Sequence, residues 1–542
     1  MRPIRRLLWF VISAVILGTL LGGTYGQRVE ATSNAGDDSD VQTSLKEFTR
    51  VYDIIQHNYA DAVDANKAVY GPETNNNVGA IPGMLRTLDP HSNFFDPRTF
   101  AQLREEQEGK YYGVGMTIQN RLNREGKLST YIVAPIPGSP AFREGLRPGD
   151  IIEKVDGKSA EGLNVSQVAD LLKGPKGTVV HVTIDREGSD QSLEFTITRD
   201  EIKRPTVDDA FLLRPGIAYI HVNGFDETTD DELSRALNQL GQKEFKGLIL
   251  DLRGNPGGLL QEAVDVSDHF LAKDQLIVYH YGRASHEKRY YVTKGNGGNE
   301  YPMVVLINRN TASAAEIVSG ALQDHDRALV IGEPSFGKGL VQTVYPLSEH
   351  AGLALTTARY YTPSGRLIQR DYKDVSLYDY YYRPEDTSAP HEQVRLTDGG
   401  REVYGGGGIM PDIEVPPVKP DEVQQRLEEH DAIYSFAKHY LGVHKTIARD
   451  FEVSQDVIEE FNKFIASQNL PVTPAEVQDN ADWVKGRIRV QLVGMIYGED
   501  EAAKIQAQND PLVAKALDAM PQAAALLAHA KQYVASRVPN PR

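Results

Sequence analysis

The chain has 542 residues, which is too long for one ordinary hydrophobic core and predicts several domains. Its formal net charge of -17 argues against nucleic-acid binding, which needs a basic face. It contains no cysteine, so disulfides and thiolate metal sites are excluded.

The N-terminus has the pattern of an export segment. Arg2, Arg5 and Arg6 precede the uncharged run LLWFVISAVILGTLLGG. Positive charge before an apolar segment keeps that end in the cytoplasm and places the following chain outside. We therefore expect a periplasmic or otherwise extracytoplasmic protein, whose residues 1–38 form a signal peptide or membrane anchor and a linker. A cleaved signal, an uncleaved anchor at residues 7–24 and a buried helix of a soluble core all remain open.

The next region, residues 39–107, is predicted to be helical. Helices are expected at residues 41–60 and 98–107, on either side of the stretch GAIPGMLRTLDPHSNFFDP. The density of proline, glycine and aspartate in that stretch indicates turns. This region therefore consists of helices joined by a turn-rich connection.

Residues 108–200 have the pattern of a small β-rich domain. Short alternating segments such as YYGVGMTI, LSTYIVAPI and TVVHVTIDREG predict about five strands, and VSQVADLL predicts one helix.

Residues 201–418 have the pattern of an α/β domain. The strands predicted here are GIAYIHV, GLILDL, QLIVYHY, MVVLIN and RALVIGE, with helices between several of them. Continuously apolar strands joined by helices indicate a largely parallel sheet covered on both faces. The segment YDYYYRPED, at residues 378–386, is predicted to be an exposed loop, and residues 419–542 are predicted to be a helical extension.

Ser313, in INRNTASAAEIVSG, allows two interpretations. Ser313 and Glu316 fit a capping box at the start of an amphipathic helix, which is a purely structural role. A helix N-terminus also supplies free N–H groups and a positive dipole, which suit a nucleophile and an oxyanion hole. The local pattern alone favours the structural interpretation.

A nucleophilic serine needs a base, which could be a histidine or a lysine. The surroundings of Ser313 lack the G-x-S-x-G pattern that accompanies a histidine base, and His325 is predicted to be a surface residue at the far end of the same helix. Lys338 lies in GEPSFGKGLVQTV among apolar residues, and burial could lower its pKa enough to make it a base. In an extended segment Lys338 and Gln342 share one face, so Gln342 could orient the amine. A solvent-exposed lysine in a glycine-rich turn is the alternative.

The segment around Lys338 also resembles a nucleotide-binding loop. Gly332, Gly337 and Lys338 match most of a Walker A loop, but Gly339 replaces the magnesium-binding hydroxyl and a strand-like segment follows, so nucleotide binding is disfavoured.

The turn DLRGNPGG, at residues 251–258, lets the backbone near Gly257 approach a ligand closely. Gly257 and Ala314 are therefore the candidate oxyanion donors, unless the glycines serve only the turn.

In chain order, the motifs GMLRTLDPHSNFFDP, YYGVG, DLRGNPGG, TASAAEI, GEPSFGKGLVQT and YYTPSGRLIQ resemble the carboxyl-terminal-processing, or tail-specific, proteases. The resemblance covers roughly residues 80–415. It implies that Ser313 is the nucleophile, Lys338 the general base and Gln342 the residue that orients it. It also implies a ClpP/crotonase-like protease core at residues 201–418 and no metal or other cofactor.

The resemblance further implies that residues 108–200 form a PDZ domain. Its carboxylate-binding loop would be YYGVG, and backbone N–H groups of Val114 to Met116 would receive the terminal carboxylate while the substrate tail adds as a strand. The substrate-binding residues would be Tyr112, Gly113, Val114, Gly115 and Met116.

We therefore expect a serine endopeptidase that recognises unstructured C-terminal tails of proteins through its PDZ domain and cleaves them through an acyl-enzyme. The alternative is a catalytically silent PDZ scaffold. The expected partners are protein or peptide substrates and, if the N-terminal segment is uncleaved, the membrane; self-association is left open.

Overall fold

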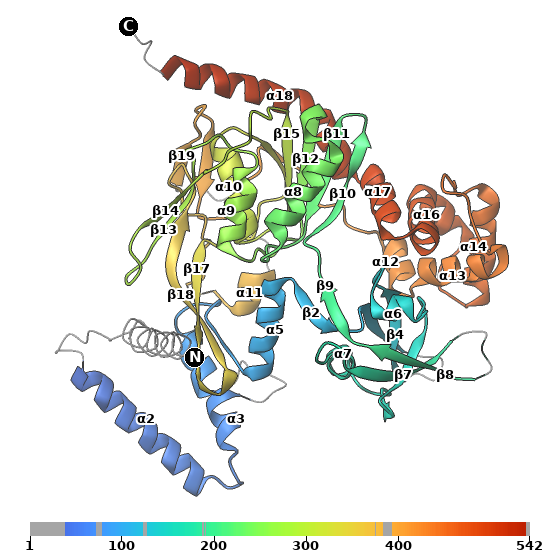
Figure 1. Ribbon diagram of the computed structural model, residues 1–542, viewed down its shortest axis with the longest axis horizontal. Coiled ribbons are helices and arrows are strands. Elements are labelled where there is room, and N and C mark those ends of the chain that lie inside the picture. Colours follow the sequence, from blue (N-terminus) through green and yellow to red (C-terminus); the bar gives the residue numbers. More distant parts are fainter. Residues whose placement is uncertain are drawn as a thin grey trace, which may run out of the picture. The chain divides into compact units, whose positions relative to one another are not determined.

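The computed structural model describes residues 38–71, 79–122, 127–186, 189, 191–373, 375–382 and 393–537, with their fold shown in Figure 1. The chain forms two compact units, residues 1–84 and 85–542. The predicted export segment lies outside the described residues. Among the helices that the structure does describe, none is both long enough and apolar enough to span a membrane.

The N-terminal helices confirm the prediction for this region. The helix expected at residues 41–60 is α2, and that expected at 98–107 is α5, which begins after the N-cap Asp96 and ends at Gly109 in the left-handed region. The helices are α2 (Asp38–Asn58), α3 (Ala65–Tyr70), α4 (Ala80–Arg86) and α5 (Pro97–Glu108).

The β-rich domain forms one sheet in the order β3-β4-β5-β7-β8, with β6 paired to β5. Strand β3 lies at an edge, and α7 covers part of the domain core with Val168 and Leu172. The chain enters and leaves through the antiparallel ribbon of β2 (Lys110–Gly113) and β9 (Asp200–Lys203). The elements are β3 (Met116–Leu122), β4 (Leu128–Pro135), α6 (Pro140–Arg143), β5 (Ile151–Val155), β6 (Lys158–Ser159), α7 (Val165–Leu172), β7 (Val179–Asp185) and β8 (Leu193–Thr198).

The α/β domain contains the predicted parallel sheet. Its order is β10-β11-β12-β15-β16-β21, in which the pairs from β11 to β21 are parallel and β10 is antiparallel to β11. The elements are β10 (Val207–Arg214), β11 (Ile217–Val222), α8 (Thr229–Leu240), η1 (Gln242–Glu244), β12 (Gly247–Asp251), α9 (Leu260–Asp268), β15 (Met303–Ile307), α10 (Ala314–Asp324), β16 (Leu329–Gly332) and β21 (Ile413–Glu414).

Each face of this sheet is covered by different helices. Leu248 and Leu250 of β12 pack with α8, α9 and α10, whereas Ile249 faces α18 together with Val513 and Ala516. Figure 1 shows α18 in red and the three green helices α8, α9 and α10 around these strands. The last helix of the predicted C-terminal extension therefore completes the core around this parallel sheet.

A second, antiparallel sheet contains β1, β13, β14, β17 and β18. The segment QLIVYHY was expected in the parallel sheet, and this prediction was wrong: it forms β13, which pairs antiparallel with β14 and β18. Its continuous apolar sequence indicates burial on both faces, and burial does not fix strand direction. The strands of this sheet are β1 (Asn93–Phe95), β13 (Leu276–Tyr281), β14 (Lys288–Tyr291), β17 (Leu340–Pro346) and β18 (Gly352–Tyr361). The same part of the chain contains η2 (Ser348–His350), α11 (Leu377–Tyr382), and β19 (Gln393–Leu396) and β20 (Glu402–Gly405), which form a separate two-stranded sheet.

The region after residue 419 is helical, as predicted. Most of it has a hydrophobic core of its own, to which Phe436, Phe461 and Ile488 contribute. The helices are α12 (Glu422–Glu429), α13 (Ala432–His444), α14 (Gln455–Ser467), α15 (Pro474–Asp479), α16 (Ala481–Tyr497), α17 (Glu499–Asn509) and α18 (Pro511–Arg537).

Candidate active site

Ser313 is the N-cap residue of α10, as the capping-box pattern predicts. Its backbone has φ 54° and ψ −114°, a conformation that is uncommon and strained for a residue with a side chain. Such a conformation persists only where its surroundings hold it. Two hydrogen bonds do so: the Ser313 N–H donates to Glu316 Oε2 at 2.8 Å, and the Tyr360 hydroxyl donates to the Ser313 carbonyl at 3.0 Å.

Glu316 is fully buried and binds more than the helix N-terminus. Oε2 accepts the backbone N–H of Ser313 and that of Lys338, the latter at 2.9 Å. Oε1 accepts the Ser335 hydroxyl and the Gly337 N–H. Burial raises the pKa of the Glu316 carboxyl, while these four donors favour its ionised form. One carboxylate thus joins the segments that carry the predicted nucleophile and the predicted base.

Lys338 lies two residues before β17, and its amine donates to Gln342 Oε1 at 2.9 Å. The contact expected from their spacing is therefore present. The Gln342 amide in turn donates to the carbonyl of His91. Burial lowers the pKa of Lys338 below its ordinary value of 10.5, against the charges of Glu316 and Asp89, which raise it. This environment favours a neutral amine.

Tyr360 provides a second link between the two segments. Its hydroxyl lies 2.8 Å from the Lys338 carbonyl and 3.0 Å from the Ser313 carbonyl. Burial keeps the pKa of this phenol well above 10, so the hydroxyl remains a hydrogen-bond donor. Sequence reasoning did not identify Tyr360, because nothing in YYTPSGRLIQ indicates which tyrosine faces the site.

The predicted oxyanion residues lie against Ser313. A Cβ atom on Gly257 would lie 2.7 Å from the Ser313 Cβ and 2.9 Å from the Ala314 nitrogen, so only glycine fits there. In this conformation the Gly257 N–H donates to Asn255 Oδ1 at 2.8 Å. Gly257 would therefore have to exchange this partner for an oxyanion, and the assignment of Gly257 and Ala314 stays a prediction.

The predicted carboxylate-binding loop joins β2 to the edge strand β3. Ala141 donates to the Val114 carbonyl at 2.8 Å, and the Ser139 hydroxyl donates to the Gly115 carbonyl at 2.7 Å. Gly115 has φ +76°, a left-handed conformation that turns the chain into β3. The loop carbonyls are thus held by the α6 segment, and the roles of Tyr112, Gly113, Val114, Gly115 and Met116 toward a ligand stay predictions.

Comparison with known proteins places these features in a family. Residues 216–375 match peptidase family S41, and residues 131–186 match the PDZ domain. A carboxy-terminal-processing protease of Bartonella bacilliformis is 37% identical over 372 residues, which are 68% of this chain and 80% of the relative. The chain belongs to the carboxy-terminal-processing protease family. It is a serine-type peptidase with a PDZ domain and the α/β fold of the S41 family.

Other relatives are similar. The carboxy-terminal processing protease CtpB of Bacillus subtilis is 34% identical over 345 residues, 63% of this chain and 68% of the relative. Among solved structures, a photosystem II D1 C-terminal processing protease is 27% identical, with 69% of this chain and 87% of that chain covered and a TM-score of 0.35.

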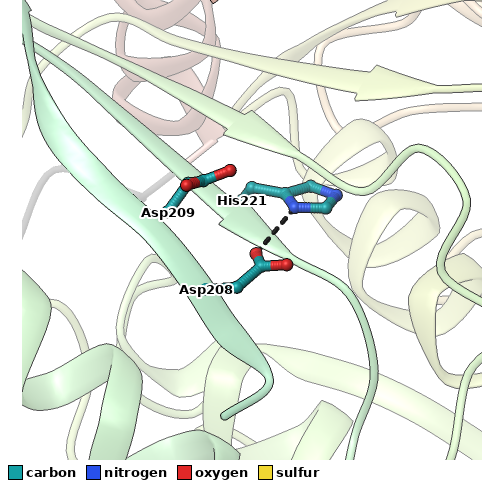
Figure 2. Close-up of side chains that lie close together, drawn as sticks. All are labelled: Asp208, Asp209 and His221. Carbon is teal, nitrogen blue, oxygen red and sulfur yellow. Dashed lines mark hydrogen bonds and ion pairs between the residues drawn. The ribbon is translucent and has the colours of Figure 1, made fainter. Parts of the chain in front are cut away.

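Figure 2 shows a cluster of acidic and imidazole side chains in this processing protease. Asp208 and Asp209 come from β10 and His221 from β11. One carboxylate oxygen of each aspartate and one ring nitrogen of His221 all lie within 4.8 Å of one another. The His221 nitrogens lie 2.7 Å from Asp208 and 3.3 Å from the Arg253 carbonyl. Arg253, in the DLRGNPGG turn, also pairs with Asp510 of the C-terminal region at 2.8 Å. The cluster therefore supports the turn next to the candidate oxyanion hole.

Two predictions about the surroundings were wrong. His325 is not a surface residue: its side chain is 8% exposed and lies 2.7 Å from both Asp398 and the Leu276 carbonyl. The YDYYYRPED segment is not simply an exposed loop. Residues 377–382 form α11, and Tyr380 is 2% exposed. Tyrosine suits an exposed loop and a buried contact alike, so the sequence could not distinguish them.

Proposed function

We propose that this processing peptidase uses a Ser/Lys mechanism. The neutral amine of Lys338 takes the proton of the Ser313 hydroxyl as the oxygen attacks the peptide carbonyl carbon. The proton passes to the leaving amine, and an ester joins Ser313 to the N-terminal fragment. Water, activated by Lys338, then hydrolyses the ester and frees the serine.

The observation that carries this proposal is the carboxylate of Glu316. By accepting the N–H groups of Ser313 and Lys338 with one oxygen, it holds the backbone of both residues in one place. The lowered pKa of Lys338 and its hydrogen bond to Gln342 supply the two other requirements of a lysine base, neutrality and orientation.

The oxyanion is proposed to be bound by backbone N–H groups of Ala314 and the Gly257 region. The steric fit of Gly257 against Ser313 and the start of α10 supports this assignment. Removing one such donor typically slows an enzyme by about 10²- to 10³-fold.

The PDZ domain, proposed to span residues 108–200, would bind the C-terminal tail of an unstructured protein. The position of β3 at a sheet edge supports strand addition there. The protease core would span residues 201–418. Helix α18, which lies outside these bounds, packs on the same sheet. We further propose that residues 1–38 export the protein and that residues 7–24 anchor it to the membrane if they are retained, because three arginines precede the apolar run.

The experiment is the cleavage of an unstructured protein by the wild type and by the variants Ser313→Ala and Lys338→Ala, at neutral pH and with EDTA present. We expect both variants to lose cleavage while they keep tail-peptide binding. Wild-type rates in Ser313→Ala would refute the nucleophile, and retained cleavage in Lys338→Ala would refute the base. Tail binding without cleavage even by the wild type would favour a silent scaffold.

A further inference from the structure

Helix α11 places a buried tyrosine beside the candidate active site. Tyr380 is 2% exposed, whereas its neighbours Tyr378 and Tyr382 on the same short helix are 71% and 66% exposed. Its ring packs edge-on against Phe336 at 5.6 Å and against His91 at 5.5 Å between centroids. The helix thus presents one side chain to the interior.

The Tyr380 hydroxyl contacts two side chains. It lies 2.8 Å from His91 Nε2 and accepts a hydrogen bond from Gln369 Nε2 at 3.2 Å. The orientation of the Gln369 amide follows from its other end, where Oε1 accepts the Gly339 N–H at 2.9 Å. Since the hydroxyl accepts from Gln369, its own proton is available for His91, and His91 Nε2 is then an acceptor on a neutral ring.

The surroundings of His91 agree with a neutral ring. The side chain is buried, and burial is the main cause that lowers its pKa from 6.5 to about 4, against the opposing charge of Asp89. A neutral imidazole with Nε2 as the acceptor carries its proton on Nδ1.

Two chains of hydrogen bonds run from this hydroxyl to Lys338. In the first, the His91 carbonyl accepts from the Gln342 amide, whose oxygen accepts from the Lys338 amine. In the second, Gln369 accepts the N–H of Gly339, the residue that follows Lys338. One hydroxyl is therefore connected to the side-chain partner of the proposed base and to the backbone of the residue that follows it.

We propose that Tyr380 is a positioning residue, which fixes the geometry of the Lys338 amine through His91, Gln342 and Gln369. The inference rests on the proposed role of Lys338 as the base. Tyr380 does not touch the reacting atoms, so its loss changes the turnover rate and leaves substrate binding intact.

The variant Tyr380→Phe isolates the hydroxyl, because it keeps the ring against Phe336, His91 and the Arg370 guanidinium, which lies 4.6 Å from the ring centroid. We expect kcat to fall about tenfold, the effect of removing one orienting hydrogen bond of about 1.4 kcal/mol. KM and the affinity for a tail peptide are expected to stay unchanged. Tyr378→Phe is the matched control, since Tyr378 is exposed on the same helix, and should behave as the wild type.

Two readouts distinguish positioning from a merely structural role. The pKa of His91, followed by NMR, should rise above about 4 in Tyr380→Phe, because the neutral ring loses a donor. The kinetic effect of Tyr380→Phe should also shrink in a Gln342→Ala background, because one chain of bonds is already broken. Wild-type kcat in Tyr380→Phe, an unchanged His91 titration, or full additivity with Gln342→Ala would overturn the inference.

Failure of the positioning role of Tyr380 can be distinguished from failure of the proposed Lys338 mechanism. If Lys338→Ala is inactive and Tyr380→Phe has wild-type kcat, only the positioning role fails. If Lys338→Ala retains full cleavage, the proposed mechanism fails, and with it the basis of the inference.

Discussion

Glu316 Oε2 accepts the backbone N–H of Lys338 at 2.9 Å and that of Ser313 at 2.8 Å, so one oxygen atom joins two residues that lie far apart in the sequence. A carboxylate with four donors and no exposed surface is held rigidly. Ser313 sits in a strained backbone conformation, and this contact is one of those that hold it there. The same side chain therefore serves as helix cap and as a support of the site.

The first prediction concerns Glu316→Gln. An amide offers one acceptor oxygen where the carboxylate offers two, so about two of the four buried donors lose their partner, at roughly 1–3 kcal/mol each. We expect reduced stability in urea unfolding and a fall in kcat/KM of at least about 10²-fold, since misplacing either segment disturbs the reacting geometry. Wild-type activity at reduced stability would mean that Glu316 supports the fold alone.

The second prediction concerns the pH dependence of cleavage. Burial lowers the pKa of Lys338 from 10.5, and only the neutral amine can act as the base. The rate should therefore rise with pH through one ionisation whose midpoint lies below 10.5. A pH profile of kcat/KM measures it, with Tyr378→Phe as a control that keeps the midpoint. A rate that falls with rising pH over this range would contradict a lysine base.

The sequence predicted the main residues of the candidate site, but fewer of the contacts that hold these residues in place. The spacing of Lys338 and Gln342 predicted their contact, because alternate residues of an extended segment share a face. The capping pattern predicted the bond between Ser313 and Glu316. That Glu316 also holds Lys338 could not be foreseen, because a local pattern specifies only the near partner of a side chain.

The same limit applies to the fold. Alternating strands and helices predicted the parallel sheet, whereas the position of β13 in the other sheet depends on its pairing with β18. The alanine-rich C-terminus predicted a helix, but the face that α18 covers is determined by tertiary packing. Tyr380 was missed for a related reason, since its connection to the site runs through a contact with His91, which is distant in sequence.

The third prediction concerns the carboxylate-binding loop. Gly115 has φ +76°, and a Cβ there would lie 2.5 Å from the Ser139 Cβ, so Gly115→Ala must distort the loop. We expect tail-peptide affinity, measured by fluorescence anisotropy, to fall at least about tenfold. Gly157→Ala is the matched control. Gly157 has φ +75° and open space around it, so this substitution introduces the same backbone strain without a steric clash. Equal affinities for the two variants would argue against a tail-binding role for the loop.

The fourth prediction concerns α18. Met520 is 9% exposed and packs with Ile249, Val304 and other residues of the sheet. Met520→Ala should lower the free energy of unfolding by about 2–5 kcal/mol, as expected for truncating a buried side chain. Gln522→Ala, on the exposed side of the helix, should change it little. Urea unfolding compares the two, and equal stabilities would show that α18 is not part of the core.

The fifth prediction concerns His221. Burial alone would lower its pKa, but the hydrogen bond and charge of Asp208 raise it to about 9 from an unfolded value of 6.5. A raised pKa gives stability that is complete below pH 6.5 and is lost as the pH rises through 9. The stability difference between the wild type and His221→Gln should therefore shrink across this range. The neighbouring Asp209, with a pKa of about 6, titrates below it. A constant difference would show that His221 is not charged in the folded protein.

The most direct test of the account is the identification of the residue that carries the acyl group. The protein is mixed with an ester substrate, quenched in acid within the first turnover and digested for mass spectrometry. The account predicts one acyl adduct, on the peptide that contains Ser313, and no adduct in Ser313→Ala. An adduct on another residue, or turnover of the ester by Ser313→Ala at the wild-type rate, would contradict it.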